Sequence, residues 1–157
     1  FESWLQQHPG IPRKVAQSFC AGAADQEDLL QEIHVAIWLA VPAFDGRSKV
    51  SSYLYRISLN RAISWRRRPR NRPPQLDPLE DHPDLAETAA TADPRLEIVY
   101  EAIRNLPAAD RALILLQLDG FAYREMAETL GLTEANIGVR LNRIRAKLAH
   151  QLKGKHP

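Results

Sequence analysis

Apolar residues recur every three to four positions along most of the chain, and no segment shows the strict alternation typical of strands. The second predicted helix begins at Asp25 as N-cap, with Asp28 three residues later in a weak capping box. We therefore expect an all-α protein. The predicted helices cover about residues 12–22, 25–41, 51–68, 94–106, 107–120, 122–130 and 134–152.

Each predicted helix carries an apolar stripe that should face a core. The inward positions are expected to be Val15, Ala16 and Phe19; Leu29, Leu30, Ile33, Ile37 and Val41; Leu54, Ile57, Ala62 and Ile63; Leu96, Val99, Ile103 and Leu106; and Leu113, Ile114, Leu116 and Leu118.

A stretch from Arg70 to Pro94 interrupts this pattern. It holds five prolines and six acidic residues, with few large apolar side chains to bury. Proline blocks helix continuation, and like charges repel one another. We predict a flexible acidic linker over residues 71–94 that joins two small helical domains, residues 1–70 and 95–157.

The formal net charge of +2 is unevenly distributed. Residues 1–72 carry 11 Lys or Arg against 6 acids, residues 73–94 carry 6 acids and no base, and residues 95–157 carry 10 bases against 7 acids. Two basic blocks of this kind indicate binding to a polyanion, although solvated faces that differ in charge explain them equally well.

Cys20 is the single cysteine, so neither an internal disulfide nor a cysteine-built metal site is expected, and Cys20 itself is expected to be buried. His34 lies two positions after Glu32, so on a helix the two side chains diverge and a metal site with Asp28 is not expected. No apolar run approaches the roughly 20 residues of a membrane span. A cytoplasmic location follows as the default, with no membrane insertion.

The last two predicted helices have the spacing of a helix-turn-helix, so the C-terminal domain is predicted to be a four-helix helix-turn-helix domain. Gly131 can end the first helix in the left-handed conformation, and Ala127 lets the two helices cross closely. Thr133 is a natural N-cap, and Ile137 begins an inner stripe. Donor side chains able to reach phosphates and base edges occupy the outer face at Asn136, Arg140, Asn142, Arg143, Arg145 and Lys147. A plain helical bundle with a cationic last helix would have the same features.

The order of several motifs resembles the extracytoplasmic-function sigma factors of the sigma-70 family. Asp25–Ile33 is similar to that family's "DAEDLVQEVF", and Ser52–Asn60 to its "TWLYRIARN". Tyr123–Ala127 resembles "YxEIAE", and Ile137–Leu148 resembles "VxxRLxRARxxL". The chain departs from the family pattern at Tyr53, His34, Ala135, Asn136 and Ile144.

The resemblance implies binding to core RNA polymerase and promoter DNA, control by an anti-sigma factor, no cofactor, no metal and no catalysis. The implied polymerase contacts are the β′ clamp helices and the β flap, with Asp28, Gln31, Glu32, Val35 and Trp38 on the clamp helices. The implied −10 element contacts are Phe44, Arg47, Ser48, Lys49, Ser51, Ser52, Asn60, Arg61, Arg66 and Arg67. The implied −35 element contacts are Tyr123, Arg124, Thr133, Glu134, Ala135, Asn136, Val139, Arg140 and Arg143.

Other interpretations stay open at this point. The helix with Asp28 and Trp38 could be an ordinary amphipathic helix, and the chain could be a helix-turn-helix regulator that binds duplex DNA without polymerase. It could also be an interaction protein that sequesters an anti-sigma factor. No convergent acid–base pair and no glycine-rich phosphate loop points to an enzyme.

Overall fold

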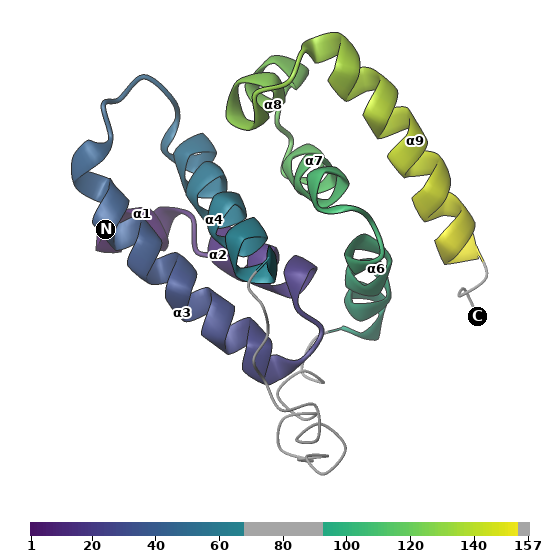
Figure 1. Cartoon of the computed structure of the whole chain (residues 1–157), viewed down its shortest axis with the longest axis horizontal. Coiled ribbons are helices and arrows are strands. Elements are labelled where there is room, and N and C mark those ends of the chain that lie inside the picture. The colour runs from purple at the N-terminus through teal and green to yellow at the C-terminus, as the bar shows by residue number, and fades with distance from the viewer. Residues whose placement is uncertain (68–92, 154–157) are drawn as a thin grey trace.

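The computed structural model describes residues 1–67 and 93–153, and every regular element within them is helical. The all-α prediction is confirmed, whereas residues 71–92 of the predicted linker lie outside the described residues. An N-terminal unit comprises α1 (Glu2–Gln7), α2 (Gly10–Phe19), α3 (Ala23–Ala40), a 3-10 turn (Val41–Ala43) and α4 (Val50–Arg67). A C-terminal unit comprises α6 (Pro94–Arg104), α7 (Ala108–Leu118), α8 (Tyr123–Leu130) and α9 (Glu134–Lys153) (Figure 1).

The N-terminal unit is built from α2, α3 and α4, which pack against one another. The predicted stripe of α3 is confirmed, because Leu29, Leu30, Ile33 and Ile37 are all buried. On α4 the stripe is rotated from the prediction: Ile57 and Ile63 are half-buried, while the fully buried positions include Leu54, Tyr55, Leu59 and Ala62. Each fully buried Leu or Ile contributes roughly 1.5–3 kcal/mol relative to an exposed one.

The predicted cap of α3 is wrong. The helix begins at Ala23 with Gly22 as its N-cap residue, so Asp25 falls inside the first turn instead of preceding it. Small residues at 22–24 let the helix start earlier than the acidic residues suggested. The Asp25 carboxylate still lies at the end of the helix where the macrodipole favours negative charge.

In the C-terminal unit, α7 is the most buried helix, with every residue from Arg111 to Leu116 inside. Helix α6 begins at Pro94, and the Asp93 carboxylate accepts a hydrogen bond from the Arg95 backbone N at 2.9 Å. Two predicted core positions are wrong: Leu96 is 52% exposed and Leu118 is 63% exposed. Both lie at helix ends, in the first turn of α6 and at the last residue of α7, where the neighbouring helices no longer cover them.

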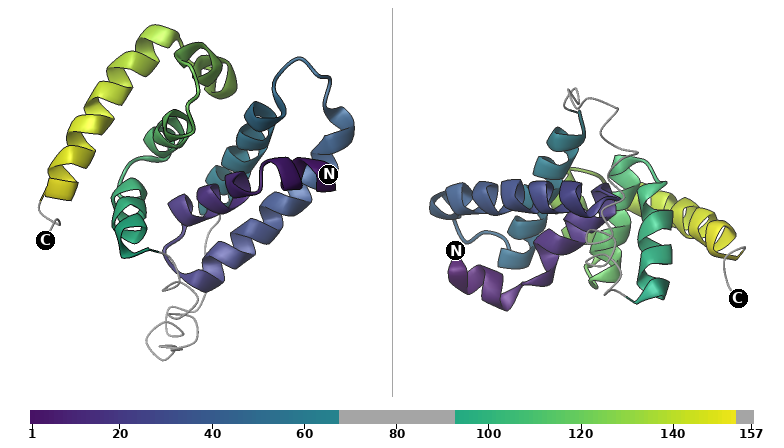
Figure 2. Two further views of the ribbon diagram at one scale, coloured as in Figure 1. Left: turned by 180° about the vertical axis from the view of Figure 1, so that it is seen from behind. Right: turned by 90° about the horizontal axis from the view of Figure 1, so that it is seen from below.

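The two units are in contact with each other. Helices α2 and α4 pack against α7, while α2 also contacts α6 and α4 also contacts α8. Helices α3 and α9 lie at opposite edges of the molecule, with the other helices between them (Figures 1 and 2). The sequence predicted two units but not this packing. Within residues 1–67 and 93–153, no helix is both long enough and apolar enough to cross a membrane.

Candidate polymerase and promoter interfaces

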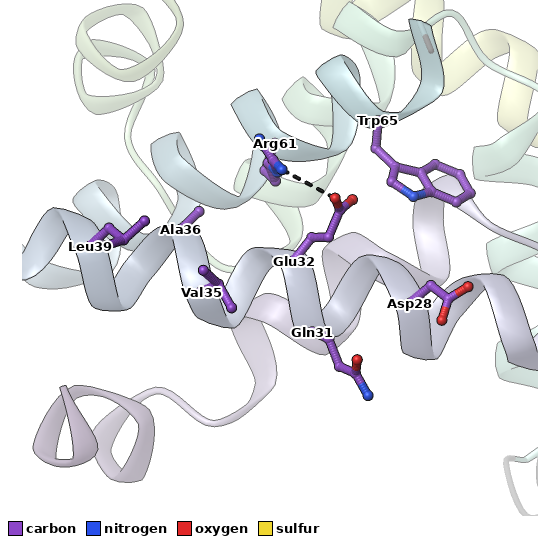
Figure 3. Close-up of a pocket in the computed structure, with 8 residues that line it drawn as sticks. All are labelled: Asp28, Gln31, Glu32, Val35, Ala36, Leu39, Arg61 and Trp65. Atoms are coloured by element: carbon purple, nitrogen blue, oxygen red, sulfur yellow. Dashed lines mark hydrogen bonds and ion pairs between the residues drawn. The ribbon is translucent and has the colours of Figure 1, made fainter. Parts of the chain in front are cut away.

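The exposed side of α3 forms the first candidate surface, which we name the α3 face. A shallow pocket between α3 and α4 is lined by Asp28, Gln31, Glu32, Val35, Ala36, Leu39, Arg61 and Trp65 (Figure 3). Four of the five residues predicted to bind polymerase therefore share one pocket. The fifth, Trp38, lies on the same helix and is 61% exposed.

The α3 face combines apolar and acidic character. Val35, Trp38 and Leu39 are exposed at positions i, i+3 and i+4, on the side of the helix away from its buried stripe. A contiguous exposed apolar stripe on a small protein marks an interaction site more often than isolated exposed leucines do. Leu39 was not among the predicted residues, although its spacing from Val35 could have revealed it.

Arg61 of α4 lines the pocket beside the α3 face and does not lie near the loop that precedes α4. Its Nη2 lies 3.1 Å from Oε1 of Glu32, in an ion pair between α4 and α3 (Figure 3). The pair fixes the direction of the Glu32 carboxylate at the floor of the pocket. Arg61 was predicted with the −10 residues because it follows Asn60 in sequence, but a helix turns adjacent residues to different sides.

The second candidate surface is the loop from Phe44 to Lys49 together with the first turn of α4. The Asp45 carboxylate accepts a hydrogen bond from the Arg47 backbone N at 3.0 Å, and Gly46 has a φ of 78°. This closed turn projects Arg47 outward, with its side chain 89% exposed. Ser48 and Lys49 are also exposed, whereas Ser51 and Ser52 are half-buried at the start of the helix.

Three aromatic rings hold the base of this loop. Trp4 packs edge-on against Phe44 and Tyr53, with ring centroids 5.0 Å and 6.0 Å away. Tyr53 donates a hydrogen bond from its hydroxyl to the Ala40 carbonyl at 2.8 Å, which ties α4 to the end of α3. Phe44 is therefore half-buried against α1. The sequence did not indicate Trp4, because the contact joins residues 40 positions apart.

The remaining predicted −10 residues lie farther along α4. Asn60 and Arg66 are exposed, but Arg66 is separated from Ser52 by about 21 Å at 1.5 Å per residue. Arg66 lines a different pocket with Arg104 and Arg111 of the C-terminal unit. The side chain of Arg67 lies outside the described residues. The structure thus gathers the loop residues of this set and separates Asn60, Arg61 and Arg66 from them.

The third candidate surface is the helix-turn-helix of α8 and α9, whose predicted geometry is confirmed. Gly131 ends α8 with φ 70° and ψ 34°, in the left-handed region. The Thr133 hydroxyl accepts a hydrogen bond from the Asn136 backbone N at 3.2 Å and caps α9. Ile137, Leu141 and Ile144 form the buried stripe of α9.

The outer side of α9 is open at its N-terminal end. Asn136, Arg143 and Val139 are exposed, as are Thr133, Glu134 and Ala135. Arg124 is also exposed, with a side chain 81% accessible, and Tyr123 is 38% exposed. Arg140 is less available, because its side chain is 31% exposed and its Nη1 lies 3.8 Å from Oδ1 of Asp110 on α7. Eight of the nine predicted −35 residues are therefore exposed, and the ninth, Arg140, is half-buried on the same α8–α9 surface.

Charged groups in the interior are structural. Arg111 is 3% exposed, and its guanidinium donates to the carbonyls of Leu106 at 2.8 Å and Arg104 at 2.5 Å while stacking over Phe19. Burial lowers the pKa of Arg111 to about 10, with the nearby Arg66 and Arg104 adding to the effect.

Among the described residues, no three His, Cys, Asp or Glu side chains are grouped as metal ligands would be. Cys20 is buried, as predicted.

Comparison with known proteins places this arrangement in a family. The model for sigma-70 region 2 matches residues 6–72, and the model for sigma-70 region 4 matches residues 96–148. The chain is 31% identical over 132 residues to the ECF RNA polymerase sigma factor SigF of Caulobacter vibrioides, covering 82% of this chain and 72% of SigF. It is 28% identical over 153 residues to the ECF RNA polymerase sigma factor SigM of Mycobacterium tuberculosis, covering 97% of this chain and 76% of SigM.

A solved structure has the same fold. The sigma factor RpoE of Bartonella quintana, determined in complex with the anti-sigma factor NepR, superimposes with a TM-score of 0.70 at 22% identity and covers 98% of this chain and 96% of its own. The paired region matches, the identity to SigF and the two helical units together show that the chain belongs to the extracytoplasmic-function sigma factors of the sigma-70 family.

Proposed function

We propose that this chain is a transcription initiation factor that binds core RNA polymerase and directs it to promoters through a −10 and a −35 element. The observation that carries the proposal is the presence of three exposed surfaces of different chemistry on one chain. They are the apolar and acidic α3 face, the cationic loop before α4 and the donor-rich start of α9. A factor that bridges an enzyme and two DNA sites needs three such surfaces.

The α3 face is the proposed polymerase contact, on the β′ clamp helices. Val35, Trp38 and Leu39 would supply the apolar area, while Asp28 and Gln31 at its edge would set the orientation. Aromatic side chains that become buried on binding usually contribute most of the free energy of an interface. The C-terminal unit is proposed to bind the β flap.

The two DNA contacts are proposed at the loop and at α9. Arg47 and Lys49 would neutralise phosphates around an opened −10 element, and Ser52 would add contacts to base edges. At the −35 element, Asn136 and Arg143 of α9 would enter the major groove while Arg124 would bind phosphate.

A helix-turn-helix regulator that works without polymerase is less well supported, because it would leave the exposed stripe on α3 without a role. The proposed function also implies a location beside the polymerase in the cytoplasm and a role in binding, not in catalysis. Control by an anti-sigma factor is proposed from family membership, since RpoE, which shares the fold, was solved with NepR bound.

Transcription with purified components tests the proposal. Core polymerase, this chain and a library of promoter fragments should yield discrete run-off transcripts that are absent without the chain. If the chain does not bind core polymerase and yields no transcripts, while binding duplex DNA tightly alone, the regulator interpretation replaces this one.

Point variants separate the surfaces. Trp38→Ala should weaken polymerase binding at least tenfold without reducing the free energy of unfolding, because the side chain is 61% exposed. The control is Gln7→Ala, which changes an exposed residue of α1 outside the proposed polymerase and DNA surfaces. Asn136→Ala should weaken promoter recognition by about 1–3 kcal/mol, the free energy of one base contact, and so reduce transcript yield. The affinity for polymerase should be unchanged. Its control is Lys147→Ala, which changes an exposed residue of α9 about 16 Å farther along the helix.

A further inference from the structure

The exposed side of α9 has an apolar centre at Val139. This side chain is 59% exposed, whereas Ile137, Leu141 and Ile144 of the same helix are buried. At about 100° per residue, Val139 lies about 160° around the helix axis from both Ile137 and Leu141. Its side chain therefore points to the side of α9 that is opposite the core of the C-terminal unit.

Small and polar residues surround Val139 on this side of the helix. Ala135 precedes it by four residues and Ala146 follows it by seven, so both share its side of α9, and both are exposed. Asn136 and Arg143 lie along one border of this apolar line and are exposed as well. The centre of the face is thus a valine between two alanines, with hydrogen-bonding groups beside it.

The charge of α9 favours a nucleic acid over a protein at this face. The helix carries one acidic residue, Glu134, against five basic ones: Arg140, Arg143, Arg145, Lys147 and Lys153. One exposed valine among cationic side chains offers far less apolar area than a protein docking patch needs. Helix α9 also lies at the edge of the molecule, where a DNA groove can reach its outer side (Figure 1).

The major groove of DNA offers an apolar group that suits such a side chain. Thymine presents its C5 methyl there, whereas adenine and guanine present donors and acceptors and cytosine presents an amino group. An aliphatic side chain contacts the methyl, but a donor placed against it would lose its hydrogen bond to water. Helix-turn-helix proteins contact base edges with the N-terminal part of the second helix, and Val139 lies in the second turn of α9.

We propose that Val139 determines part of the −35 specificity by contacting the C5 methyl group of a thymine. The inference rests on the proposed function, in which α9 reads the −35 element, and it adds the kind of base that the centre of α9 selects. Asn136 lies about 4.5 Å from Val139 along the helix axis, between one and two base-pair steps of about 3.4 Å. The thymine therefore lies within about two base pairs of the base that Asn136 contacts.

Selection from a random duplex library locates the thymine. The selecting protein is the full chain bound to core polymerase and, in a second format, the full chain alone at low salt. The wild type should enrich a thymine at one position, and Val139→Ser should lose that enrichment while keeping the other preferences. Serine and valine have similar helix propensities, so the free energy of unfolding should change little. The control is Ala149→Ser, which adds the same hydroxyl at an exposed position about 15 Å farther along α9.

Modified bases then isolate the methyl group, with affinities measured by fluorescence anisotropy at constant salt. Deoxyuridine in place of the selected thymine removes only the methyl, and 5-methylcytosine in place of cytosine adds one on the same ring carbon. The wild type should bind the deoxyuridine duplex about fourfold more weakly than the thymine duplex, the effect of one buried methyl group. It should bind 5-methylcytosine more tightly than cytosine by a similar factor. Val139→Ser should bind both members of each pair equally, and Ala149→Ser should match the wild type.

Four outcomes would overturn the inference. They are a selection without an enriched thymine in either format, equal binding of the thymine and deoxyuridine duplexes by the wild type, and a methyl preference that Val139→Ser retains. The fourth is a loss of polymerase affinity in Val139→Ser with unchanged base preference, which would assign the face to a protein contact. A failure of the proposed function is distinguishable, because polymerase binding and transcripts would be absent while selection with the chain alone still reports the base.

Discussion

Substituting alanine at two glycines of the helix-turn-helix should change stability in opposite directions. Gly131 has a φ of 70°, and an added Cβ there would meet nothing within 4 Å, so the cost of Gly131→Ala is one of backbone conformation alone. An L-residue in the left-handed region costs roughly 1–2 kcal/mol, of which about 0.5 kcal/mol is returned by the lower entropy of the unfolded chain. We expect a net loss of about 1 kcal/mol.

Gly138 provides the matched comparison on the next helix. It lies inside α9, and an added Cβ would sit 3.6 Å from Cε2 of Tyr123, an ordinary van der Waals distance. Replacing a mid-helix glycine by alanine stabilises a helix by roughly 0.5–1 kcal/mol. Gly138→Ala should therefore raise the free energy of unfolding by about 0.7 kcal/mol.

Urea unfolding followed by circular dichroism measures both changes. The two variants should differ by about 1.7 kcal/mol, equivalent to a difference in Tm of about 5 °C for a chain of this size. Gly131→Asn should lose less than Gly131→Ala, since asparagine tolerates the left-handed region. The reasoning would be refuted if Gly131→Ala were as stable as the wild type, or if both alanine variants shifted stability in the same direction.

Four further substitutions test the interactions of buried and half-buried polar side chains. Arg111→Met keeps the packing over Phe19 but leaves two carbonyls near the end of α6 without their donors, so urea unfolding should show a loss of about 3 kcal/mol; an unchanged midpoint would contradict this. Among the described residues the Oγ of buried Ser58 has no hydrogen-bond partner, whereas that of Ser18 donates to the Lys14 carbonyl at 2.7 Å. Ser58→Ala should therefore raise the free energy of unfolding by about 1 kcal/mol, and Ser18→Ala should lower it. Equal changes in the two variants would contradict the description of the Ser58 hydroxyl as unsatisfied. Burial, then the charge of Arg13, lowers the pKa of His34 below 6.5, against a smaller opposing effect of Glu27, so the unfolded chain binds the proton first as the pH falls. The free energy of unfolding should decrease as the pH falls from 7 through 6.5 towards the folded-state pKa, by at most about 1.4 kcal/mol per pH unit. His34→Gln should remove this part of the pH dependence. The same slope in the variant as in the wild type would contradict the prediction.

Much of the fold could be predicted from residues close together in the sequence. Gly131 and Thr133 specify the end of α8 and the start of α9 through hydrogen bonds within a few residues, so both were identified correctly. The stripe of α3 followed from helical periodicity alone. Errors fell at helix ends, at Asp25, Leu96 and Leu118, because a local pattern does not tell where neighbouring helices stop covering a residue. A further error fell inside α4, where Ile57 and Ile63 are only half-buried because the packing of α4 on its neighbours sets the direction of its buried stripe.

The candidate site was only partly predictable for the same reason. Arg61 was grouped with Asn60 by sequence, but its partner Glu32 comes from another helix 29 positions away. The aromatic support of the loop by Trp4 likewise depends on how α1 packs.

The sequence by itself determined the helices, the helix-turn-helix and the family, because periodicity, capping residues and ordered motifs act within a few turns of chain. Only the tertiary structure decided that the two units close on each other. Asp119 contacts Lys14, which is 105 positions away in the sequence, and Tyr55, which is 64 positions away. Neither contact can be predicted from the residues on either side of Asp119. Contacts between residues so far apart in sequence depend on how whole helices pack. The presence of a carboxylate at the end of α7 does not by itself indicate which residues will bind it.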